Sequence, residues 1–107
     1  MFFKYPRDFT KVDYKPGEKA EYVWGEGMLL ARVLVNSEPR GSTHECRQIS
    51  LVLDGEFELE IGSETMRLTK GDAFYIPAGV RHTIVKVIAR PVEIVDVWPV
   101  SGPEVPD

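Results

Sequence analysis

The fold is decided by the stretch Gly71-Asp72-Ala73-Phe74-Tyr75-Ile76-Pro77-Ala78-Gly79-Val80-Arg81-His82. Gly-Asp at its start is a turn signal, and the three large residues after Ala73 favour a strand. Pro77 and Gly79 end that strand, because proline cannot donate to a ladder and glycine takes backbone angles that other residues avoid. His82 then falls where a new strand should begin. The pattern predicts an imidazole held at the mouth of a sheet, a position that suits a metal ligand.

The rest of the chain also predicts short strands separated by turns. Met28–Val35 is nearly all apolar, which is typical of a strand covered on both faces. Other strands are expected at Tyr22–Trp24, Glu64–Leu68, Ala73–Ile76, His82–Ile88 and Val92–Trp98, with Ala89-Arg90-Pro91 between the last two and an edge strand near Phe9–Tyr14. About eight short strands without a helical period predict an all-β barrel or sandwich. We expect an N-terminal arm at 1–21, the barrel at 22–98 and an irregular tail at 99–107.

A hairpin is predicted in the middle of the chain, because Asp54-Gly55 is a strong two-residue turn signal. With this turn Val52 faces Phe57, and the side chains of both strands divide between two faces. The inner face would carry Gln48, Ser50, Val52, Phe57, Leu59 and Ile61. The outer face would carry Ile49, Leu51 and Leu53 beside Glu56, Glu58 and Glu60. An aliphatic stripe on an outer face is typical of a subunit interface, so we predict a homodimer.

Candidate metal ligands come from the strand that enters this predicted hairpin. Alternation along it places Ser42, His44, Cys46 and Gln48 on one face. Since Gln48 points inward, His44 should also look into the barrel, as should His82, the only other histidine. Two imidazoles and an amide oxygen suit a divalent ion of borderline hardness such as Zn, Mn, Fe or Ni. The thiolate of Cys46 is a further candidate ligand that would favour Zn, although a lone cysteine is more often an inert core residue.

These residues resemble the two motifs of the cupins, small β-barrel proteins that usually hold a metal ion. The stretch from Gly71 matches the second motif, Gly-x5-Pro-x-Gly-x2-His. In the first motif His44 matches the second histidine, Gln48 the carboxylate and Gly55 the closing glycine, whereas Ser42 replaces the first histidine. The resemblance implies a single-domain antiparallel jelly-roll barrel, with a metal held by His44, Gln48 and the histidine of the second motif. The alternative is a cupin that has lost its ion, with both histidines hydrogen-bonded inside the barrel.

The chain also resembles the pectin-degradation cupins, through Gln48 and the stretches Val-Leu-Asp-Gly-Glu-Phe-Glu and Gly-Asp-Ala-Phe-Tyr-Ile-Pro. Those proteins convert 4,5-unsaturated uronates into linear ketonised sugars. Near the C-terminus they have an aspartate and an aromatic residue two apart, followed by an arginine. Asp96 and Trp98 match the first two positions, and Gly102 lies near the position of the arginine. The resemblance implies a metal-dependent isomerase or lyase-like enzyme acting on a small anionic, sugar-derived molecule.

Asp96 can also be interpreted without the family. Alternation within Val92–Trp98 puts Ile94, Asp96 and Trp98 on one face. A carboxylate between large apolar groups near a cation suits a general acid or base, and equally suits a structural carboxylate capped by backbone donors. Two other functions stay open. One is a non-haem metal dioxygenase; the other is a non-catalytic cupin that binds or senses a small molecule, which Ser42 and the missing arginine favour.

Composition sets the outer limits. The 107 residues fit one domain, and the net charge of −4 leaves no basic surface for nucleic acid. No apolar run is long enough to span a bilayer. The single cysteine fits a reducing compartment and the start lacks a signal peptide, so we expect a cytoplasmic protein. Asn36 and Gln48 are the only side-chain amides, a depletion that favours a thermophilic source.

Arg32 lies in an apolar strand, so we expect it to pair with a carboxylate or an anionic ligand.

Overall fold

The computed structural model describes residues 1–15, 18–36, 43 and 47–100. Every regular element among these residues is a strand: β1 (Thr10–Lys15), β2 (Glu18–Gly25), β3 (Met28–Val35), β4 (Gln48–Ile61), β5 (Glu64–Thr69), β6 (Ala73–Ile76) and β7 (His82–Pro99). All of their pairings are antiparallel. The predicted all-β antiparallel fold is therefore confirmed. Within the described ranges there is no helix of the length and apolar character needed to cross a membrane.

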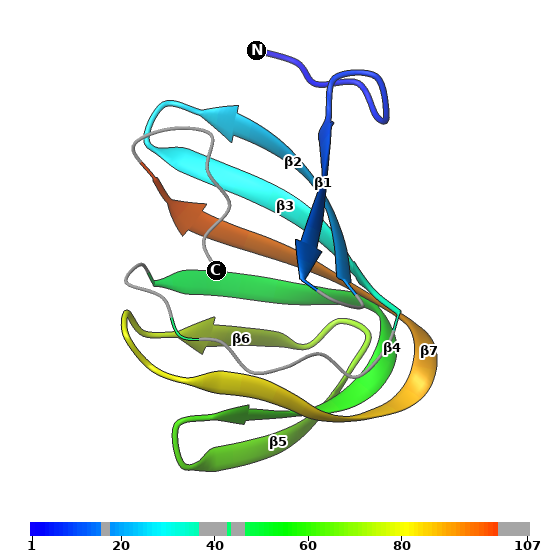
Figure 1. Cartoon of the computed structure of the whole chain (residues 1–107), viewed down its shortest axis with the longest axis vertical. Coiled ribbons are helices and arrows are strands. Elements are labelled where there is room, and N and C mark those ends of the chain that lie inside the picture. Colours follow the sequence, from blue (N-terminus) through cyan, green and yellow to red (C-terminus); the bar gives the residue numbers. More distant parts are fainter. Residues whose placement is uncertain (16–17, 37–42, 44–46, 101–107) are drawn as a thin grey trace.

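Two long strands, β4 and β7, run through both layers of the barrel and join them (Figure 1). The strand order is β1-β2-β3-β7-β4-β5, and β6 pairs with the first part of β4. The larger layer therefore contains β1, β2, β3, β6 and the adjoining halves of β4 and β7. The smaller layer contains β5 and the other halves of the two long strands. Closing the layers over one another gives the small jelly-roll barrel that the sequence predicted.

The hairpin predicted at Asp54-Gly55 is wrong, because β4 continues through these residues as one strand. Gly55 has a φ of 89°, and a Cβ there would lie 2.8 Å from the Cα of Val92 and press against the carbonyl oxygen of Pro91. Glycine is required because it has no Cβ and tolerates this backbone angle. The register between β4 and β7 shifts on both sides of the glycine. Gly55 thus marks a bend where β7 passes close to β4, and the chain does not reverse there.

The faces predicted for β4 are nevertheless correct. Val52 is buried before the bend and Phe57 is buried after it, although five positions would normally place them on opposite faces. The register shifts at the bend change the parity as a two-residue turn would. Ile49 and Leu51 are exposed on the outer face. The core inside the barrel consists of Ala20, Leu29, Ala31, Val33, Val35, Val52, Phe57, Leu59, Leu68, Val92, Ile94 and Trp98.

Two other strand predictions differ from the structure in their bounds. The strands predicted at His82–Ile88 and Val92–Trp98 form one continuous β7, and the predicted break at Ala89-Arg90-Pro91 is the bend of β7 beside Gly55. β2 begins at Glu18, whereas its strand was predicted from Tyr22, and it pairs with β3 along its whole length. The early part of β2 was missed because it is mostly charged. Only Ala20 in that part is buried in the core.

Candidate functional site

The fold brings Gln48 and His82 to the same end of the barrel. Gln48 is the first residue of β4, and Ile61, the last residue of β4, pairs with His82 at the start of β7. Because β4 folds back at its bend, its two ends lie on the same side of the molecule (Figure 1). Two of the three predicted metal ligands therefore approach one barrel opening from different layers.

A hydrogen-bonded chain links Gln48 to Asp96 through Ser50. Gln48 Nε2 donates to Ser50 Oγ at 3.0 Å, and Ser50 Oγ donates to Asp96 Oδ1 at 2.6 Å. Ser50 and Asp96 face each other directly in the pairing of β4 with β7. All three residues are buried: Gln48 is 6% exposed, Ser50 3% and Asp96 8%. The inner face of the larger layer thus carries a buried polar row that ends in a carboxylate.

His82 is half-buried, and its ring is oriented by the turn that precedes it. Its Nδ1 lies 3.3 Å from the carbonyl oxygen of Val80. The turn itself is closed by Val80 N donating to Pro77 O, and it is tied to the end of β4 because Gly62 N donates to Arg81 O at 2.9 Å. When Nδ1 carries the proton that this carbonyl accepts, the lone pair lies on Nε2, which is the nitrogen that a metal would use.

Trp98 lies beside Gln48 at this end and has a donor that needs a partner. The side chain is 2% exposed, and its Nε1–H has no hydrogen bond to the residues that the structure describes. A cavity of about 300 Å³ at this end of the barrel is lined by the buried Gln48 and Trp98, and it extends to Ile49, Tyr75 and Val97 of the outer face. Buried indole donors normally find an acceptor. The cavity therefore joins the predicted ligand Gln48 to the aromatic residue that was predicted to line the substrate site.

His44, Cys46 and Ser42 lie outside the described residues, so the structure does not locate the first half of the predicted metal site. Within the described ranges no group of three His, Cys, Asp or Glu residues could hold a metal ion. The described donors still fit one. Gln48 donates through its nitrogen to Ser50, so Oε1 is the atom of this amide that could ligate a metal, and His82 could ligate through Nε2. An amide oxygen and an imidazole suit the borderline divalent ions predicted from the sequence; the ligand set stays a prediction.

Sequence reasoning missed the part that Ser50 plays. Alternation placed Ser50 on the inner face, but nothing predicted that it would bridge Gln48 and Asp96. The signal was a small polar residue at an inward position of a strand lined by apolar side chains, because such a residue needs a hydrogen-bond partner. Its partner could not be named without knowing that β4 and β7 are neighbours.

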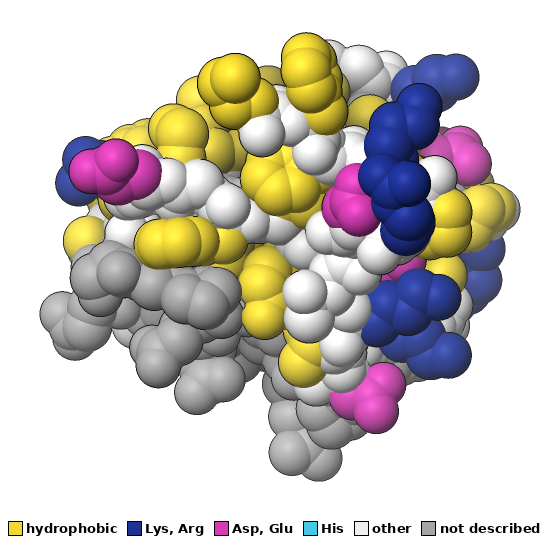
Figure 2. Space-filling view, turned by 90° about the horizontal axis from the view of Figure 1, so that it is seen from above, with side chains coloured by type: hydrophobic (Ala, Val, Ile, Leu, Met, Phe, Trp, Pro, Cys, Tyr) yellow, Lys and Arg dark blue, Asp and Glu magenta, His cyan; other side chains and the backbone are white. Residues whose placement is uncertain are grey.

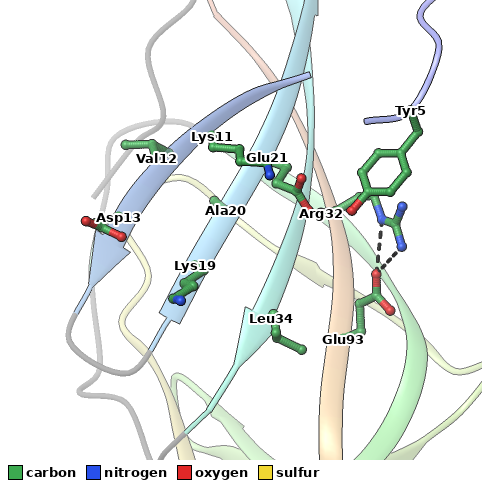
Figure 3. Close-up of a pocket in the computed structure, with 10 residues that line it drawn as sticks. All are labelled: Tyr5, Lys11, Val12, Asp13, Lys19, Ala20, Glu21, Arg32, Leu34 and Glu93. Atoms are coloured by element: carbon green, nitrogen blue, oxygen red, sulfur yellow. Dashed lines mark hydrogen bonds and ion pairs between the residues drawn. The ribbon is translucent and has the colours of Figure 1, made fainter. Parts of the chain in front are cut away.

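A second hollow, of about 500 Å³, lies on the outside of the barrel among β1, β2, β3 and the N-terminal segment (Figure 3). Arg32 forms an ion pair with Glu93 and lies 4.3 Å from the ring centroid of Tyr5. Its hydrogen bond with Glu93 raises the pKa of Arg32. The sequence left open a carboxylate or an anionic ligand for this arginine, and the structure shows the carboxylate.

The charges of this outer hollow largely compensate one another. Tyr5 donates to Glu21, and that hydrogen bond raises the pKa of Tyr5. In the pairing of β1 with β2, Lys11 lies opposite Glu21, and Lys19 lies opposite Asp13. Seen from above, Lys and Arg side chains gather along one side of the molecule with acidic side chains beside them (Figure 2). Among the described residues Arg32 already has a carboxylate partner in Glu93, so the barrel opening carries the stronger candidate site.

Comparison with known protein families matches residues 30–98 to the cupin domain. No curated protein matches the chain. Among solved structures, an RmlC-like cupin from Shewanella frigidimarina NCIMB 400 is similar with a TM-score of 0.77 and 22% identity, over 92% of this chain and 90% of that one. KdgF from Halomonas sp. is similar with a TM-score of 0.78 and 24% identity, over 92% and 93% of the two chains.

Part of a larger protein is also similar. A deletion mutant of oxalate decarboxylase OxdC from Bacillus subtilis has a TM-score of 0.77 at 17% identity, over 94% of this chain and 30% of that chain. At these identities the solved structures show a shared fold and nothing finer. The family match and the similar solved structures both indicate a cupin fold.

Proposed function

Because this chain belongs to the cupin family, we propose that it is a metal-dependent enzyme of the isomerase or lyase type that acts on a small anionic, sugar-derived molecule. The observation that carries the proposal is the buried carboxylate of Asp96, linked through Ser50 to Gln48 at the barrel opening that also holds His82. A buried carboxylate beside metal-binding groups is a common arrangement for moving a proton.

The divalent ion would be held by His44, Gln48 and His82, with Cys46 as a further candidate ligand. Once bound, it would polarise a carbonyl or enol oxygen of the substrate as a Lewis acid. All three main ligands are neutral, so the ion would keep its full charge and attract an anion. Zn, Mn, Fe and Ni all suit this donor set. One of the similar proteins, oxalate decarboxylase from Bacillus subtilis, has Mn(II) centres.

The other residues of the opening would bind and position the substrate. Asp96 would take up the proton of the ring's hemiacetal hydroxyl as the ring C–O bond breaks, and would return it to the carbon end of the enolate that forms. The hydroxyl of Ser50 would hold the carboxylate in place through its 2.6 Å hydrogen bond. Trp98 would give the sugar ring an apolar wall in the cavity that it shares with Gln48.

The substrate class comes from the resemblance to the pectin-degradation cupins, so a 4,5-unsaturated uronate is the first compound to test. Metal-loaded wild-type protein should convert it to the linear ketonised sugar, and His82→Ala protein should not. The loss of the substrate's conjugated absorbance measures the reaction. Absence of turnover by wild-type protein loaded with each of the four metals would contradict the uronate assignment.

A non-catalytic binding or sensing function is the second candidate. Ser42 in place of a ligating histidine, and Gly102 near the position of the family's arginine, favour it. A protein of this kind would bind the uronate or another small acid without changing it. Calorimetry with unreacted uronate separates the two functions, because binding without turnover supports the sensing function and rejects the enzyme.

We also propose that the chain forms a homodimer through the outer face of the larger layer. Ile49 lies between Tyr75 of β6 and Val97 of β7, and Leu51 lies between Ala73 and Val95. The exposed apolar side chains of β4 therefore continue onto both neighbouring strands, and no charged residue interrupts these two rows. A second copy of these two apolar rows is the self-complementary partner that two-fold symmetry provides.

A further inference from the structure

The hydrogen-bonded chain from Gln48 to Asp96 has a direction. A serine hydroxyl carries one proton, and Ser50 gives it to Asp96 at 2.6 Å, which is in the range of bonds from a hydroxyl to a carboxylate. Ser50 Oγ must then accept from position 48. The amide of Gln48 supplies that donor through Nε2 at 3.0 Å. If Oε1 faced Ser50 instead, one proton would have to serve two acceptors.

This direction determines which atom of Gln48 can be a ligand. With Nε2 donating to Ser50, Oε1 is the atom of the amide that has lone pairs for a metal. A glutamate at position 48 has no proton to donate at neutral pH. The carboxylate of such a glutamate would face Ser50 Oγ, whose one proton is already donated to Asp96. Since Gln48, Ser50 and Asp96 are all buried, water cannot readily repair the missing bond.

We propose that Ser50 is a positioning residue that fixes the amide of Gln48 with Oε1 as the ligand atom, so that the site is built for an amide and not for a carboxylate at position 48. This inference rests on the proposed metal binding. It supplies a physical reason for the glutamine that stands where the cupin motif has a carboxylate. The neutral ligand at position 48 and the buried carboxylate of Asp96 are joined by the same hydrogen bonds through Ser50.

The test measures Zn²⁺ affinity of the folded protein by competition with a chromophoric chelator. Ser50→Ala should weaken Zn²⁺ binding about 10- to 100-fold, the usual effect of removing a group that orients a ligand. Ser63→Ala makes the same chemical change at an exposed turn position and should leave the affinity unchanged. Ser50→Thr keeps the hydroxyl and should stay close to wild type.

Gln48→Glu provides a second, independent arm. A carboxylate ligand ordinarily strengthens the binding of a dication, but here it should leave the affinity equal or weaker, and it should lower the Tm of the metal-free protein. The inference is overturned if Ser50→Ala binds Zn²⁺ within twofold of wild type, or if Gln48→Glu binds it tenfold more tightly. Wild-type protein that binds no Zn²⁺ would instead reject the metal-dependent function on which the inference rests.

Discussion

At the scale of single residues, Asp96 carries the chemistry of the proposed site. Among the described residues it is the acidic residue whose exposure is lowest, at 8%. Burial of a carboxylate is costly unless hydrogen bonds compensate it, and Ser50 supplies one such bond at 2.6 Å. Such a carboxylate suits either proton transfer or a structural role, and the two can be separated by experiment.

Asp96→Asn separates the catalytic role of this residue from a structural one. Asparagine retains an oxygen that accepts from Ser50, so the Tm should change by only a few degrees. It cannot take up a proton, so turnover of the uronate should fall about 10²- to 10⁴-fold. The rate and the Tm are measured on the same metal-loaded preparations.

Asp13→Asn is the matched control, since Asp13 is exposed on β1 and lines the outer hollow, not the cavity beside Gln48 and Trp98. Its turnover should equal that of wild type. An Asp96→Asn protein with undiminished turnover would show that Asp96 is a structural carboxylate.

The inward positions of Gln48 and Asp96 could be predicted from the sequence, because strand alternation is a local property. The bridge made by Ser50 could not, because Ser50 and Asp96 become neighbours only when β4 and β7 pair. That pairing joins residues 46 positions apart along the chain. The predicted turn at Asp54-Gly55 even assigned β4 a different partner.

At the scale of elements, the bends of β4 and β7 are the feature that the sequence signalled but did not explain. Asp54-Gly55 and Ala89-Arg90-Pro91 were both recognised as interruptions, since glycine and proline disturb regular strands wherever they occur. Local signals do not distinguish a strand that bends from one that reverses. The close approach of Gly55 to Pro91 and Val92 decides the matter, and it exists only in the folded barrel.

Replacing Gly55 tests whether this close approach is required. Gly55→Ala combines a positive φ with a clash against backbone atoms of β7. Gly71→Ala is the matched control, because Gly71 has a φ of 95° but no atom within 4 Å of the added Cβ.

Backbone strain alone should cost about 1–2 kcal/mol at Gly71, and the clash at Gly55 should cost about 1–3 kcal/mol more. Guanidinium unfolding of both variants measures the difference in free energy of unfolding. Equal destabilisation by the two substitutions would show that the bend has room for a side chain.

At the scale of the whole molecule, the outer face of the larger layer is the proposed dimer interface, and a substitution there tests it. Ile49→Glu places a charge in the middle of the proposed interface and should convert the homodimer into a monomer, because an unpaired charge is costly to bury. Val85→Glu makes the same type of change at an exposed position on the smaller layer and should leave the dimer intact. Light scattering after size-exclusion chromatography gives the mass of each. A monomeric wild-type protein would contradict the interface.

The most direct measurement of the central claim is the metal content of protein purified without chelator. Gln48 at the start of β4 and His82 beside the end of β4 lie at the same end of the barrel. Mass spectrometry of the metals should therefore find a stoichiometric divalent ion in wild-type protein and none in His82→Ala. A correctly folded wild-type protein that carries no metal and takes none up, or a His82→Ala protein that retains a full complement, would contradict the claim.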